Sequence, residues 1–537
     1  MNRPADFRGI FTTDETARAV YSEAAGITQL VPAAIAVPSD AEDVQALVRW
    51  AAHEKIAVIP RGSGSSMAGG AVGTGVILDL SRLNGIGHID KQTKTVHVGP
   101  GAICDRVNQV ASKVGLRFPV SPSSSKFCSI GGMAATNAAG AHTLRFGPTR
   151  TWIDALDCVF ADGTRGVIRR GGGIPPNIPA LGCFLHDLQS RMPTKRTVAP
   201  FVHQGVRKDS SGYGVGAYAE SGDLLDLLVG SEGTLAIFVA LEISLAPIPE
   251  SVSSVLAEFN SLEDAVAASQ KAAALGASAC ELLDQTFLEF SGTYGTDIPQ
   301  AVLLAEVEAE SDRSAQTSAG MLAKAFTASG ARSVKIGISE IEQKEIWELR
   351  HAASPILGKL DPRLKSMQLV EDGAVPPVNL AAYVTGLREA FSRQGMRGVI
   401  FGHAGDAHVH ANPLIDTEAE GWRSRTGELL TEVVALVARL GGTLTGEHGD
   451  GRLRAPYLAD VWSEEAMRLF SDIKRCFDPE GMLNPGVKFA KHDRGLEPIK
   501  YDPSLTPLPE KARQALDLVT ADRLYDHFRL SLIGQSQ

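Results

Sequence analysis

The sequence predicts a soluble protein of the α+β class with two main domains, and three observations lead to this prediction. The chain has 537 residues, more than one ordinary hydrophobic core accommodates. Its hydrophobic content of 44% and charged content of 21% are those of a globular protein. Helix and strand signals alternate over the first 250 residues, and a new pattern begins at "APIPES", around residues 247–251.

The first region is predicted to contain one long helix followed by short strands and glycine loops. The helix follows Ser39 as its N-cap in "SDAEDVQALVRWAAHEKI", with acidic residues in its first turn. Strands are predicted in "AVIPRGSG", "GVILDLSRL" and "TVHVGPGA", and a hairpin in "LDCVFADGTRGVIR" turns at Asp162-Gly163. The segment 171–207 is rich in Pro and Gly and is interpreted as a long loop or insertion.

The second region is predicted to mix strands with amphipathic helices. "AVLLAEVEAE" is typical of a strand and "SLEDAVAASQKAAALGA" of an amphipathic helix. A glycine-rich segment and then a polar tail with one helix-like run follow. The predicted division of the chain is therefore 1–250, 251–440, 441–490 and 491–537.

Composition excludes several classes of protein. The net charge of −10 and the lack of a Lys/Arg-rich stripe argue against a nucleic-acid partner. The N-terminus lacks a signal-peptide core, and no run of about 18 apolar residues predicts a membrane helix. The six cysteines form no C-x-x-C, and the nearest pair, Cys104 and Cys128, is 24 residues apart. This excludes a ferredoxin pattern and a zinc ribbon and fits a reducing compartment. We expect a cytoplasmic protein that reaches the inner membrane only through a partner.

Three segments of the first region combine glycines with small polar residues. "PRGSGSSMAGGAVGTG" (60–75) offers successive N–H groups and hydroxyls that suit a diphosphate. It is not a Rossmann loop, because Met67 replaces the third glycine, and no Gly-Lys-Ser/Thr makes it a Walker A loop. "SSSKFCSIGGMAATNAAGAHTLRFG" (123–147) and "LLVGSEGTLAIF" (227–238) leave room for a flat ligand. A flexible turn explains any one of these loops equally well.

Taken together and in this order, the three segments resemble the FAD-binding domain of the vanillyl-alcohol-oxidase family, over roughly residues 28–247 and 441–489. The resemblance implies a two-subdomain PCMH-type FAD-binding domain and an α/β substrate (cap) domain with an antiparallel sheet. The first loop has no histidine, so non-covalent FAD is expected, although His142 follows the second loop closely. The implied pyrophosphate contacts are Arg61, Gly62, Ser63, Gly64, Ser65 and Ser66, and the implied flavin contacts are Gly131, Gly132, Asn137, Gly140, Ile237 through its backbone, and Asn484.

Histidines cluster in "FGHAGDAHVH" (401–410) and "GEHGDG" (446–451). Imidazole and carboxylate groups suit zinc or manganese, and three protein ligands leave a position open for substrate. On a strand, His408 and His410 point to one face, whereas His403 and His410 need a bend between them. Satisfied core histidines in capped loops are the alternative interpretation.

The two histidine segments resemble those of the D-2-hydroxyglutarate and D-lactate dehydrogenase branch of the same family, to which the glycolate oxidase flavin subunit is similar. The resemblance implies that His403, His410 and Glu447 are metal ligands and that His448 is the catalytic base. His408 is then a neighbouring residue or a spare ligand. Two aspartates in these motifs, Asp406 and Asp450, are expected either to orient the imidazoles or to cap turns.

The chemistry implied is oxidation of a 2-hydroxy acid that chelates the metal through its hydroxyl and carboxylate. His448 would take the hydroxyl proton, and a hydride would pass from the α-carbon to flavin N5. Substrate carboxylates need cationic or polar partners. By resemblance or proximity these are Arg350, Ser354, Lys365 and Arg452, with Arg454 as a further candidate, although each charge also fits a solvated helix face.

We therefore expect an FAD- and metal-dependent dehydrogenase for a D-2-hydroxy acid, with D-2-hydroxyglutarate ahead of D-lactate and glycolate. The alternatives are a flavin-binding subunit with little activity of its own and a metal-dependent hydrolase. No cysteine follows Cys476. Electrons are thus expected to leave through an iron–sulfur subunit, an electron-transfer flavoprotein, a quinone or a cytochrome. The tail 491–537 is expected to dock such a partner or a second copy in a homodimer, or to strap its own domain.

Overall fold

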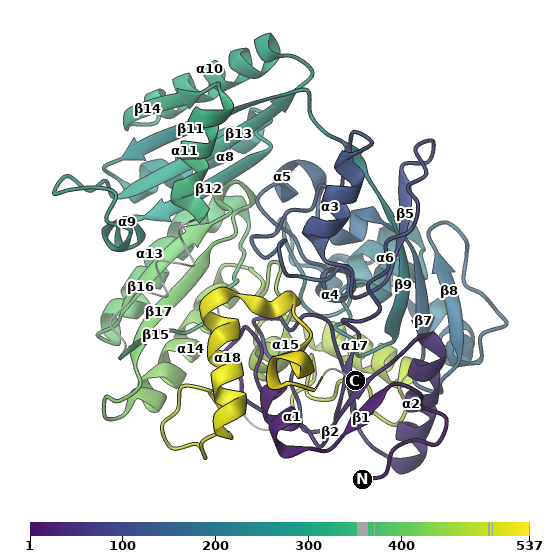
Figure 1. Ribbon diagram of the computed structural model, residues 1–537. Coiled ribbons are helices and arrows are strands. Elements are labelled where there is room, and N and C mark those ends of the chain that lie inside the picture. Colours follow the sequence, from purple (N-terminus) through teal and green to yellow (C-terminus); the bar gives the residue numbers. More distant parts are fainter. Residues whose placement is uncertain (352–362, 370, 492–493, 497, 536–537) are drawn as a thin grey trace.

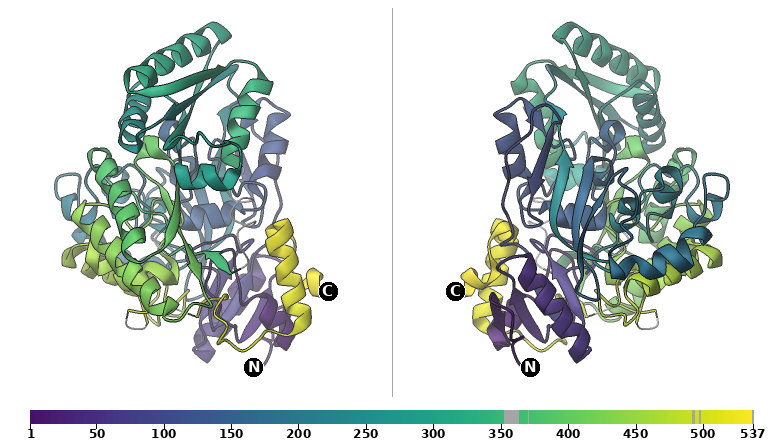
Figure 2. Two further views of the ribbon diagram at one scale, coloured as in Figure 1. Left: turned by 90° about the vertical axis from the view of Figure 1, so that its left-hand side faces the viewer. Right: turned by 90° about the vertical axis from the view of Figure 1, so that its right-hand side faces the viewer.

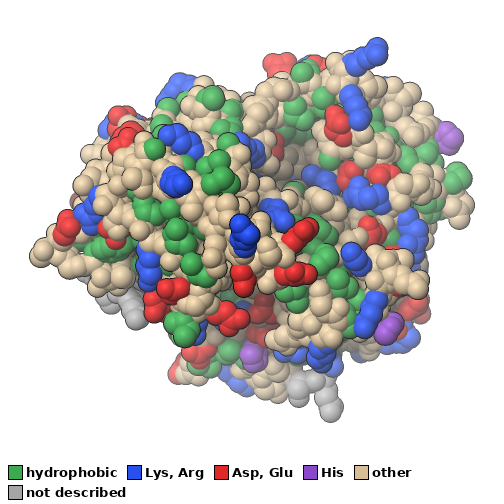
Figure 3. Space-filling view, turned by 90° about the horizontal axis from the view of Figure 1, so that it is seen from above, with side chains coloured by type: hydrophobic (Ala, Val, Ile, Leu, Met, Phe, Trp, Pro, Cys, Tyr) green, Lys and Arg blue, Asp and Glu red, His purple; other side chains and the backbone are tan. Residues whose placement is uncertain are grey.

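The computed structural model describes residues 1–351, 363–369, 371–491, 494–496 and 498–535 (Figure 1). A small sheet and a second antiparallel sheet form the lower and right parts of Figure 1, and a larger sheet rises at the upper left. Lysine, arginine and acidic side chains are interspersed over the face seen in Figure 3. Among the described helices, none has the length and apolar character that crossing a bilayer requires.

The first sheet has the strand order β1-β2-β4-β3, with β1 antiparallel and the other three strands parallel. Both of its faces are covered, as is usual for parallel strands. Val44 and Leu47 of α2 pack on one face, whereas α1 covers the other. The elements are β1 (Ile10–Thr12), α1 (Glu15–Val20), β2 (Ala34–Val37), α2 (Ala41–Glu54), β3 (Val58–Arg61) and β4 (Val76–Asp79).

The long helix α2 begins one residue later than the sequence predicts. Asp40, not Ser39, is its N-cap, and its carboxylate accepts a hydrogen bond from Asp43 N at 3.0 Å. A carboxylate fits this position well because it also interacts favourably with the helix dipole. Ser39 instead donates its backbone N–H to Asp43 at 2.8 Å.

The second sheet has the order β5-β9-β7-β8 and is antiparallel throughout. The predicted hairpin is present as β7 and β8, and its turn residue Gly163 has φ +78°, which favours glycine. The strands are β5 (Thr95–Val98), β7 (Ile153–Val159), β8 (Arg165–Arg169) and β9 (Ile237–Ser244), with β6 (Leu116–Arg117) and β10 (Ala246–Pro247) paired separately. The helices around it are α3 (Cys104–Ser112), α4 (Ile130–Thr136), α5 (Thr143–Phe146), α6 (Val215–Ser221) and α7 (Leu224–Leu228).

The insertion at 171–207 consists of short turns that are packed onto the protein. Phe184 is fully buried, and its ring centroid lies 5.7 Å from that of Phe477 in α17 (Glu464–Phe477). A disulfide joins Cys183 of the insertion to Cys476 of the same helix. The wide spacing of the six cysteines predicted no disulfide, and this prediction is wrong for these two. Their separation of 293 residues leaves no local pattern that would have paired them.

The third sheet is antiparallel, with the order β14-β11-β13-β12-β16-β17-β15. Helices α8, α10, α13 and α14 cover one face, whereas α9 and α11 cover the other. The strands are β11 (Ser251–Phe259), β12 (Ala279–Asp284), β13 (Ala301–Ala309), β14 (Ala331–Gly337), β15 (Leu364–Ser366), β16 (Arg397–Gly402) and β17 (His410–Asp416). The helices are α8 (Leu262–Ala274), α9 (Gln285–Ser291), α10 (Asp312–Ala328), α11 (Glu340–His351), α13 (Leu380–Arg393) and α14 (Trp422–Arg439).

The chain then returns to the first two sheets. Its last helix, α18, lies against α1 in both views of Figure 2 and packs into the same apolar cluster. Of the two roles considered for the tail, the structure shows the strap over its own domain. The last helices are α15 (Gly451–Arg454), α16 (Leu458–Val461), α17 (Glu464–Phe477) and α18 (Glu510–Asp522).

Asp284, at the end of β12, should make stability depend on pH. It is 1% exposed and caps α9 by accepting a hydrogen bond from Phe287 N at 2.9 Å. Burial raises the pKa of Asp284 to about 7. The folded pKa thus exceeds the unfolded value of about 3.9, so its contribution to stability is complete below about pH 4 and is lost as the pH rises through 7. Asp284→Asn keeps the cap and should gain up to about 4 kcal/mol over the wild type by about pH 8.

Thermal unfolding midpoints of the wild type and Asp284→Asn, compared at about pH 5 and about pH 8, check this prediction. The advantage of the variant should grow with pH. Glu250→Gln, at an exposed carboxylate, is the matched control and should show no such growth. A constant difference between Asp284→Asn and the wild type would mean that Asp284 does not titrate in this range.

Candidate active site

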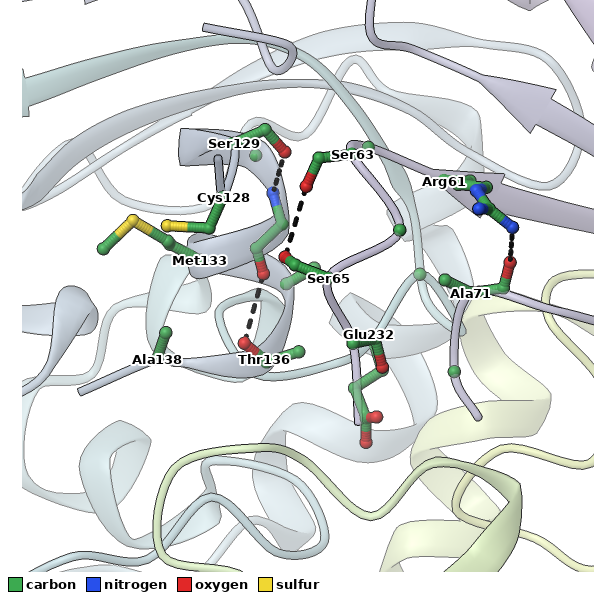
Figure 4. Close-up of a pocket in the computed structure, with 18 of the residues that line it drawn as sticks. Arg61, Ser63, Ser65, Ala71, Cys128, Ser129, Met133, Thr136, Ala138 and Glu232 are labelled. Atoms are coloured by element: carbon green, nitrogen blue, oxygen red, sulfur yellow. Dashed lines mark hydrogen bonds between the residues drawn. The ribbon is translucent and has the colours of Figure 1, made fainter. Parts of the chain in front are cut away.

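One cavity joins the glycine-rich segments to the second histidine motif (Figure 4). It encloses about 1170 Å³ of empty space, including its opening to solvent. Its walls are formed by parts of 60–71, 122–139 and 232–238, together with Leu80, Pro100, Glu447 and His448.

The first glycine loop runs from the end of β3 along the cavity wall. A Cβ added at Gly62 would lie 2.2 Å from Ser129 Oγ, so this close approach requires glycine. Ser63 Oγ donates to Ser65 Oγ at 3.2 Å, and the two side chains face each other in Figure 4. Ser66 Oγ is buried and has no hydrogen-bond partner among the described residues. The loop therefore offers hydroxyls and backbone groups that fit a diphosphate.

Arg61 turns its guanidinium behind this loop instead of into the cavity. Its Nη1 donates to the carbonyls of Tyr21 and Ala71 at 3.2 and 3.3 Å, and its Nη2 donates to Glu23 O at 3.0 Å. Figure 4 shows the Ala71 contact. A Cβ at Gly64 would lie 2.4 Å from Nη2. The side chain of Arg61 thus supports the loop from its reverse side, and a direct contact with pyrophosphate would use only its backbone.

The expected flavin contacts divide into two groups. Gly131, Gly132 and Ile237 line the cavity, whereas Asn137, Gly140 and Asn484 lie outside its wall. Asn137 ends α4 in the left-handed region with φ +52°, which an asparagine tolerates. Its Oδ1 accepts a hydrogen bond from Arg150 N at 3.0 Å, so its amide serves the backbone.

Asn484 and Arg452 fasten the far end of the first loop. Asn484 Nδ2 donates to Gly70 O at 3.0 Å and to Glu232 O at 2.8 Å. Arg452 donates to Gly69 O at 2.8 Å and to Asn484 Oδ1 at 2.9 Å. The sequence analysis expected Arg452 to bind substrate, but the structure directs its guanidinium to the cofactor loop.

Two histidines converge on one oxygen of Glu447. His403 Nε2 and His410 Nε2 lie 3.1 and 3.5 Å from Glu447 Oε1. The turn η7 (Ala404–Asp406) between β16 and β17 provides the bend that brings these histidines together. His448 stacks on His410 with ring centroids 5.1 Å apart, and its Nε2 lies 3.7 Å from the same oxygen. All but His448, which is partly exposed, are buried.

The nitrogen and oxygen donors form two groups that share Glu447. One contains Asp372, His410 and His448, and the other contains His403 and His408, with the donor atoms of each group within 4.8 Å of one another. His410 Nδ1 is buried and lacks a hydrogen-bond partner within the described chain. Imidazole nitrogens and a carboxylate oxygen from separate segments are a donor set that fits zinc or manganese.

Three carboxylates that the sequence analysis did not single out hold the histidines. His403 Nδ1 lies 2.6 Å from Glu281 Oε1, and His448 Nδ1 lies 3.0 Å from Glu371 Oε1. Asp372 Oδ2 accepts the backbone N–H of His448 at 2.8 Å. A carboxylate on the second ring nitrogen fixes the orientation and tautomer of an imidazole.

Asp372 also holds His408, whose Nε2 lies 2.8 Å from Asp372 Oδ1. The ring centroids of His408 and His410 are 4.8 Å apart. Asp406 and Asp450, which the sequence analysis expected to orient imidazoles, make other contacts. Asp406 Oδ2 faces Lys208, and Asp450 accepts hydrogen bonds from the backbone of the 207–212 segment and from a buried lysine.

The electrostatic surroundings shift the pKa values of His410 and His448 in opposite directions. Burial lowers the pKa of His410 to about 3, which keeps this imidazole neutral, the form that binds metals. Burial also lowers the pKa of His448, but Asp372 and Glu371 outweigh it and raise the value to about 9. Burial raises the pKa of Glu371, but Arg454 outweighs it at 2.7 Å, and the pKa falls to about 2. The guanidinium of Arg454 is thus paired with Glu371 and Asp372, the carboxylates that contact His448.

Lys208 is a buried cation that sequence reasoning missed. Its Nζ donates to Glu447 Oε2 and to Gly140 O, each at 3.0 Å, and its side chain is 1% exposed. It therefore connects the second glycine segment to the histidine loop. Burial raises the pKa of Glu447, but Lys208 and His403 outweigh burial and hold it well below its usual value.

Arg350 lies beside the cluster with its guanidinium already paired. Its Nε donates to Glu281 Oε2 at 2.7 Å, and the guanidinium lies 5.1 Å from the ring centroid of Phe401. Since Glu281 also contacts His403, Arg350 supports the cluster through this carboxylate. Ser354, the neighbouring candidate, lies outside the described residues.

Lys365 is not brought to the histidine cluster. It pairs with Ile415 in the sheet, five residues along β17 from His410, which corresponds to about 16 Å. Its ammonium lies 5.7 Å from the ring centroid of Tyr501. The resemblance alone suggested this residue, and its position depends on the strand register.

His142 has both ring nitrogens engaged away from the cavity. Nδ1 lies 2.8 Å from Ser121 Oγ, and Nε2 lies 2.6 Å from Glu306 Oε1 of β13. It does not line the cavity. This geometry favours non-covalent binding of a flavin.

One of the missed residues had a signal in the sequence. Glu281 lies in "ACELLD", a strand whose six residues are all buried, and a carboxylate in such an apolar run implies a specific partner. Lys208 had no such signal, because its carboxylate partner Glu447 lies 239 residues further along the chain.

Comparison with known proteins agrees with this geometry. Residues 32–168 match the FAD binding domain family, and residues 248–487 match the C-terminal domain of FAD linked oxidases. Glycolate oxidase subunit GlcD of Bacillus subtilis (strain 168) is 30% identical over 494 residues, covering 90% of this chain and 95% of that protein. D-2-hydroxyglutarate dehydrogenase of Xanthomonas citri pv. viticola is 30% identical over 478 residues, covering 86% and 90%.

The fold is shared with a more distant protein. The solved structure of 4-ethylphenol oxidase from Gulosibacter chungangensis matches 90% of this chain and 94% of its own, with a TM-score of 0.65 and 17% identity. The unpaired Ser66 hydroxyl and the glycine-lined cavity fit a cofactor with a diphosphate, such as FAD. The chain therefore belongs to the vanillyl-alcohol-oxidase (PCMH-type) flavoprotein family, in the branch of glycolate oxidase subunit GlcD and D-2-hydroxyglutarate dehydrogenase, and is an FAD-dependent oxidoreductase.

Proposed function

We propose that the protein is a D-2-hydroxy-acid dehydrogenase that depends on FAD and a divalent metal, with D-2-hydroxyglutarate as its substrate. The observation that carries this proposal is the continuity of the cavity, which reaches from the cofactor loop to Glu447 and His448. A flavin in this cavity and a substrate at the histidine cluster would be neighbours. The names of the relatives support a 2-hydroxy acid as substrate, because glycolate and D-2-hydroxyglutarate both belong to this class.

His403, His410 and Glu447 are the residues that would hold the metal. A zinc or manganese ion there would supply Lewis acidity toward the substrate hydroxyl and carboxylate and would favour the neutral form of a nearby imidazole. Glu281 orients His403, and Lys208 holds the second oxygen of Glu447, so the donors are fixed before a ligand arrives.

His448 is the group that would remove the hydroxyl proton. It is the partly exposed histidine of the cluster and lines the cavity, whereas His403 and His410 are buried behind Glu447. Its Nδ1 faces Glu371, which leaves Nε2 directed to the side where Glu447 lies. Glu371, held in turn by Arg454, stabilises the imidazolium that forms. Bound FAD supplies the acceptor for the hydride that leaves the α-carbon.

The electron acceptor and the compartment belong to the same proposal. The reduced flavin is proposed to pass electrons to a separate partner, which is an iron–sulfur subunit, an electron-transfer flavoprotein, a quinone or a cytochrome. The relative from Bacillus subtilis is named as a subunit, which supports a partner protein.

A cytoplasmic location, with membrane contact through such a partner, is proposed from the sequence. The alternative function is a flavin-binding subunit with little activity of its own. The histidine cluster argues for activity, because a subunit without activity would not need a set of metal donors.

The proposal is tested by mixing metal-loaded holoprotein anaerobically with D-2-hydroxyglutarate, D-lactate or glycolate and following flavin absorbance near ~450 nm. We expect rapid bleaching by D-2-hydroxyglutarate and slower bleaching by the two smaller acids. The L enantiomer of 2-hydroxyglutarate is the matched control and should leave the flavin oxidised. Bleaching by none of these acids, with FAD and metal both bound, would contradict the proposal and favour the subunit without its own activity.

A further inference from the structure

The C-terminal tail is connected to the first glycine loop by hydrogen bonds through the segment 25–29. Both family matches end before the tail, the later one at residue 487. Gln29 N donates to Pro498 O at 2.8 Å, and Lys500 N donates to Ile27 O at 2.9 Å. The tail therefore forms a short antiparallel ladder with the segment 27–29.

The same segment holds the loop that faces the cavity. Ala25 N donates to Gly64 O at 2.9 Å, and Gly26 N donates to Ser66 O at 3.1 Å. The ammonium of Lys500 lies 3.3 Å from Ala25 O. A continuous set of hydrogen bonds thus links the tail to the serine loop on the cavity wall.

An apolar contact anchors the tail to the sheet that carries this loop. Residues of α18 and of the turn after it pack against alternate residues of β2, β3 and β4 and against α1. Ile59 of β3 is two residues before Arg61, so the anchor lies directly under the start of the loop. The buried residues of this contact are Ala512, Ala515, Leu516, Leu530 and Ile533 from the tail, and Ile35, Val37, Ile59 and Ile77 from the sheet.

Two arginines are buried together behind the loop. Arg529 of the tail is 3% exposed and Arg61 is 2% exposed. Nε and Nη1 of Arg529 and Nε of Arg61 have no hydrogen-bond partner in the described part of the chain. Burial, and after it the charge of Arg61, lower the pKa of Arg529 to about 10. Asp79 is the acidic group close to both, and it accepts hydrogen bonds from Tyr21 and the backbone of Ser81.

The charges around this pair do not balance. Glu23 is the next carboxylate, but it pairs with Arg513 of α18 at 2.8 Å. Two guanidinium groups and one carboxylate, Asp79, are then left behind the loop among the described residues. A buried cation without a counter-ion is unfavourable, and an anion on the cavity side of the same loop would relieve it. The diphosphate of FAD is an anion of this kind.

The tail also contacts the second glycine segment, which forms another part of the cavity wall. The ring of Tyr525 lies 5.3 Å from that of Phe127, the residue before the cavity-lining Cys128, and Arg529 lies over the same tyrosine at 5.3 Å. Movement of the tail would therefore be transmitted to both the first and second glycine segments.

We propose that the tail 498–533 is part of the FAD site, with Arg529 as a positioning residue that stands behind the first glycine loop and favours the cofactor diphosphate. Because binding and docking are linked equilibria, FAD and the docked tail then stabilise each other by the same factor. The proposal concerns cofactor binding and does not depend on which 2-hydroxy acid is oxidised.

The first test measures binding of FAD, ADP and riboflavin to the full-length apoprotein. Arg529→Met should weaken FAD and ADP by about tenfold or more and leave riboflavin, which carries no phosphate, unchanged. Arg529→Lys keeps the charge and should restore most of the affinity. Lys511→Met removes an exposed charge from α18, the tail helix that precedes Arg529, and is the matched control, with wild-type affinity expected.

The second test measures hydrogen exchange of residues 510–533 with and without FAD. In the wild type, FAD should slow exchange of α18, and Arg529→Met should remove most of this protection. FAD and ADP affinities of Arg529→Met within about twofold of wild type, or equal weakening of riboflavin, would overturn the role of the charge. Exchange in α18 that does not respond to FAD would overturn the coupling. No 2-hydroxy acid is present in either test, so a failure here is distinct from a failure of the proposed reaction.

Discussion

Replacing His448 by glutamine should slow reduction of the flavin by the substrate by about 10²–10⁴-fold, the range that a general base contributes. Glutamine is similar in size and can still contact Glu371, but it cannot accept the hydroxyl proton. His448 lines the cavity and Glu371 lies on its Nδ1, so the structure leaves Nε2 for this task. Single-turnover reduction, followed by flavin absorbance, gives the rate without interference from the electron acceptor.

His53→Gln is the control for this measurement, because the side chain of His53 is 83% exposed on α2. It should reduce its flavin at the wild-type rate. The FAD content of His448→Gln should also equal that of the wild type, since the side chain contributes one part of a large cavity wall. A His448→Gln rate within about tenfold of wild type would show that another group takes the proton.

Removal of divalent cations by a chelator should abolish flavin reduction while the FAD stays bound. Glu447 lines one end of the cavity with His403 and His410 behind it, whereas the cofactor loops that would hold the flavin form separate parts of the wall. Restoring zinc or manganese should restore the rate, and the better of the two identifies the preferred ion. Elemental analysis and the visible flavin spectrum of the same sample check both parts of the prediction.

His410→Ala provides the genetic counterpart. It removes one donor that burial keeps neutral and should lower metal content to background after dialysis, with the flavin spectrum retained. His97→Gln, at an exposed histidine of β5, is the matched control. Metal-free protein that is still reduced at the wild-type rate would refute metal dependence and leave the FAD-dependent oxidation in place.

Much of the fold could be predicted because it depends on short-range patterns. The hairpin at Gly163 follows from an Asp-Gly turn between two strands, and the presence of helix α2 follows from the helical spacing of its apolar residues. The helix start was misplaced by one residue, because Ser39 and Asp40 are both good caps and the choice depends on where Asp43 lies. The disulfide between Cys183 and Cys476 had no local signal at all.

The residues of the candidate site also fall into those that local sequence predicts and those that only packing places. The cofactor loops were found because glycine and serine have to be in particular positions for a backbone to approach a diphosphate. By contrast, Lys365 and Arg452 were assigned to substrate from resemblance and proximity, and the structure directs them to Tyr501 and to the cofactor loop. A long cationic side chain extends in a direction that its neighbours in sequence do not set.

The sequence by itself determined the fold class, the glycine loops and the two histidine motifs, since dihedral preferences and residue spacing are local properties. Only the tertiary structure decided which groups act together. It placed Glu281 on His403 and Lys208 on Glu447, and it brought Arg529 of the tail behind a loop more than 450 residues earlier in the chain. Such contacts arise when sheets and helices bury their apolar faces against one another, and the polar groups that come together are then fixed by the packing.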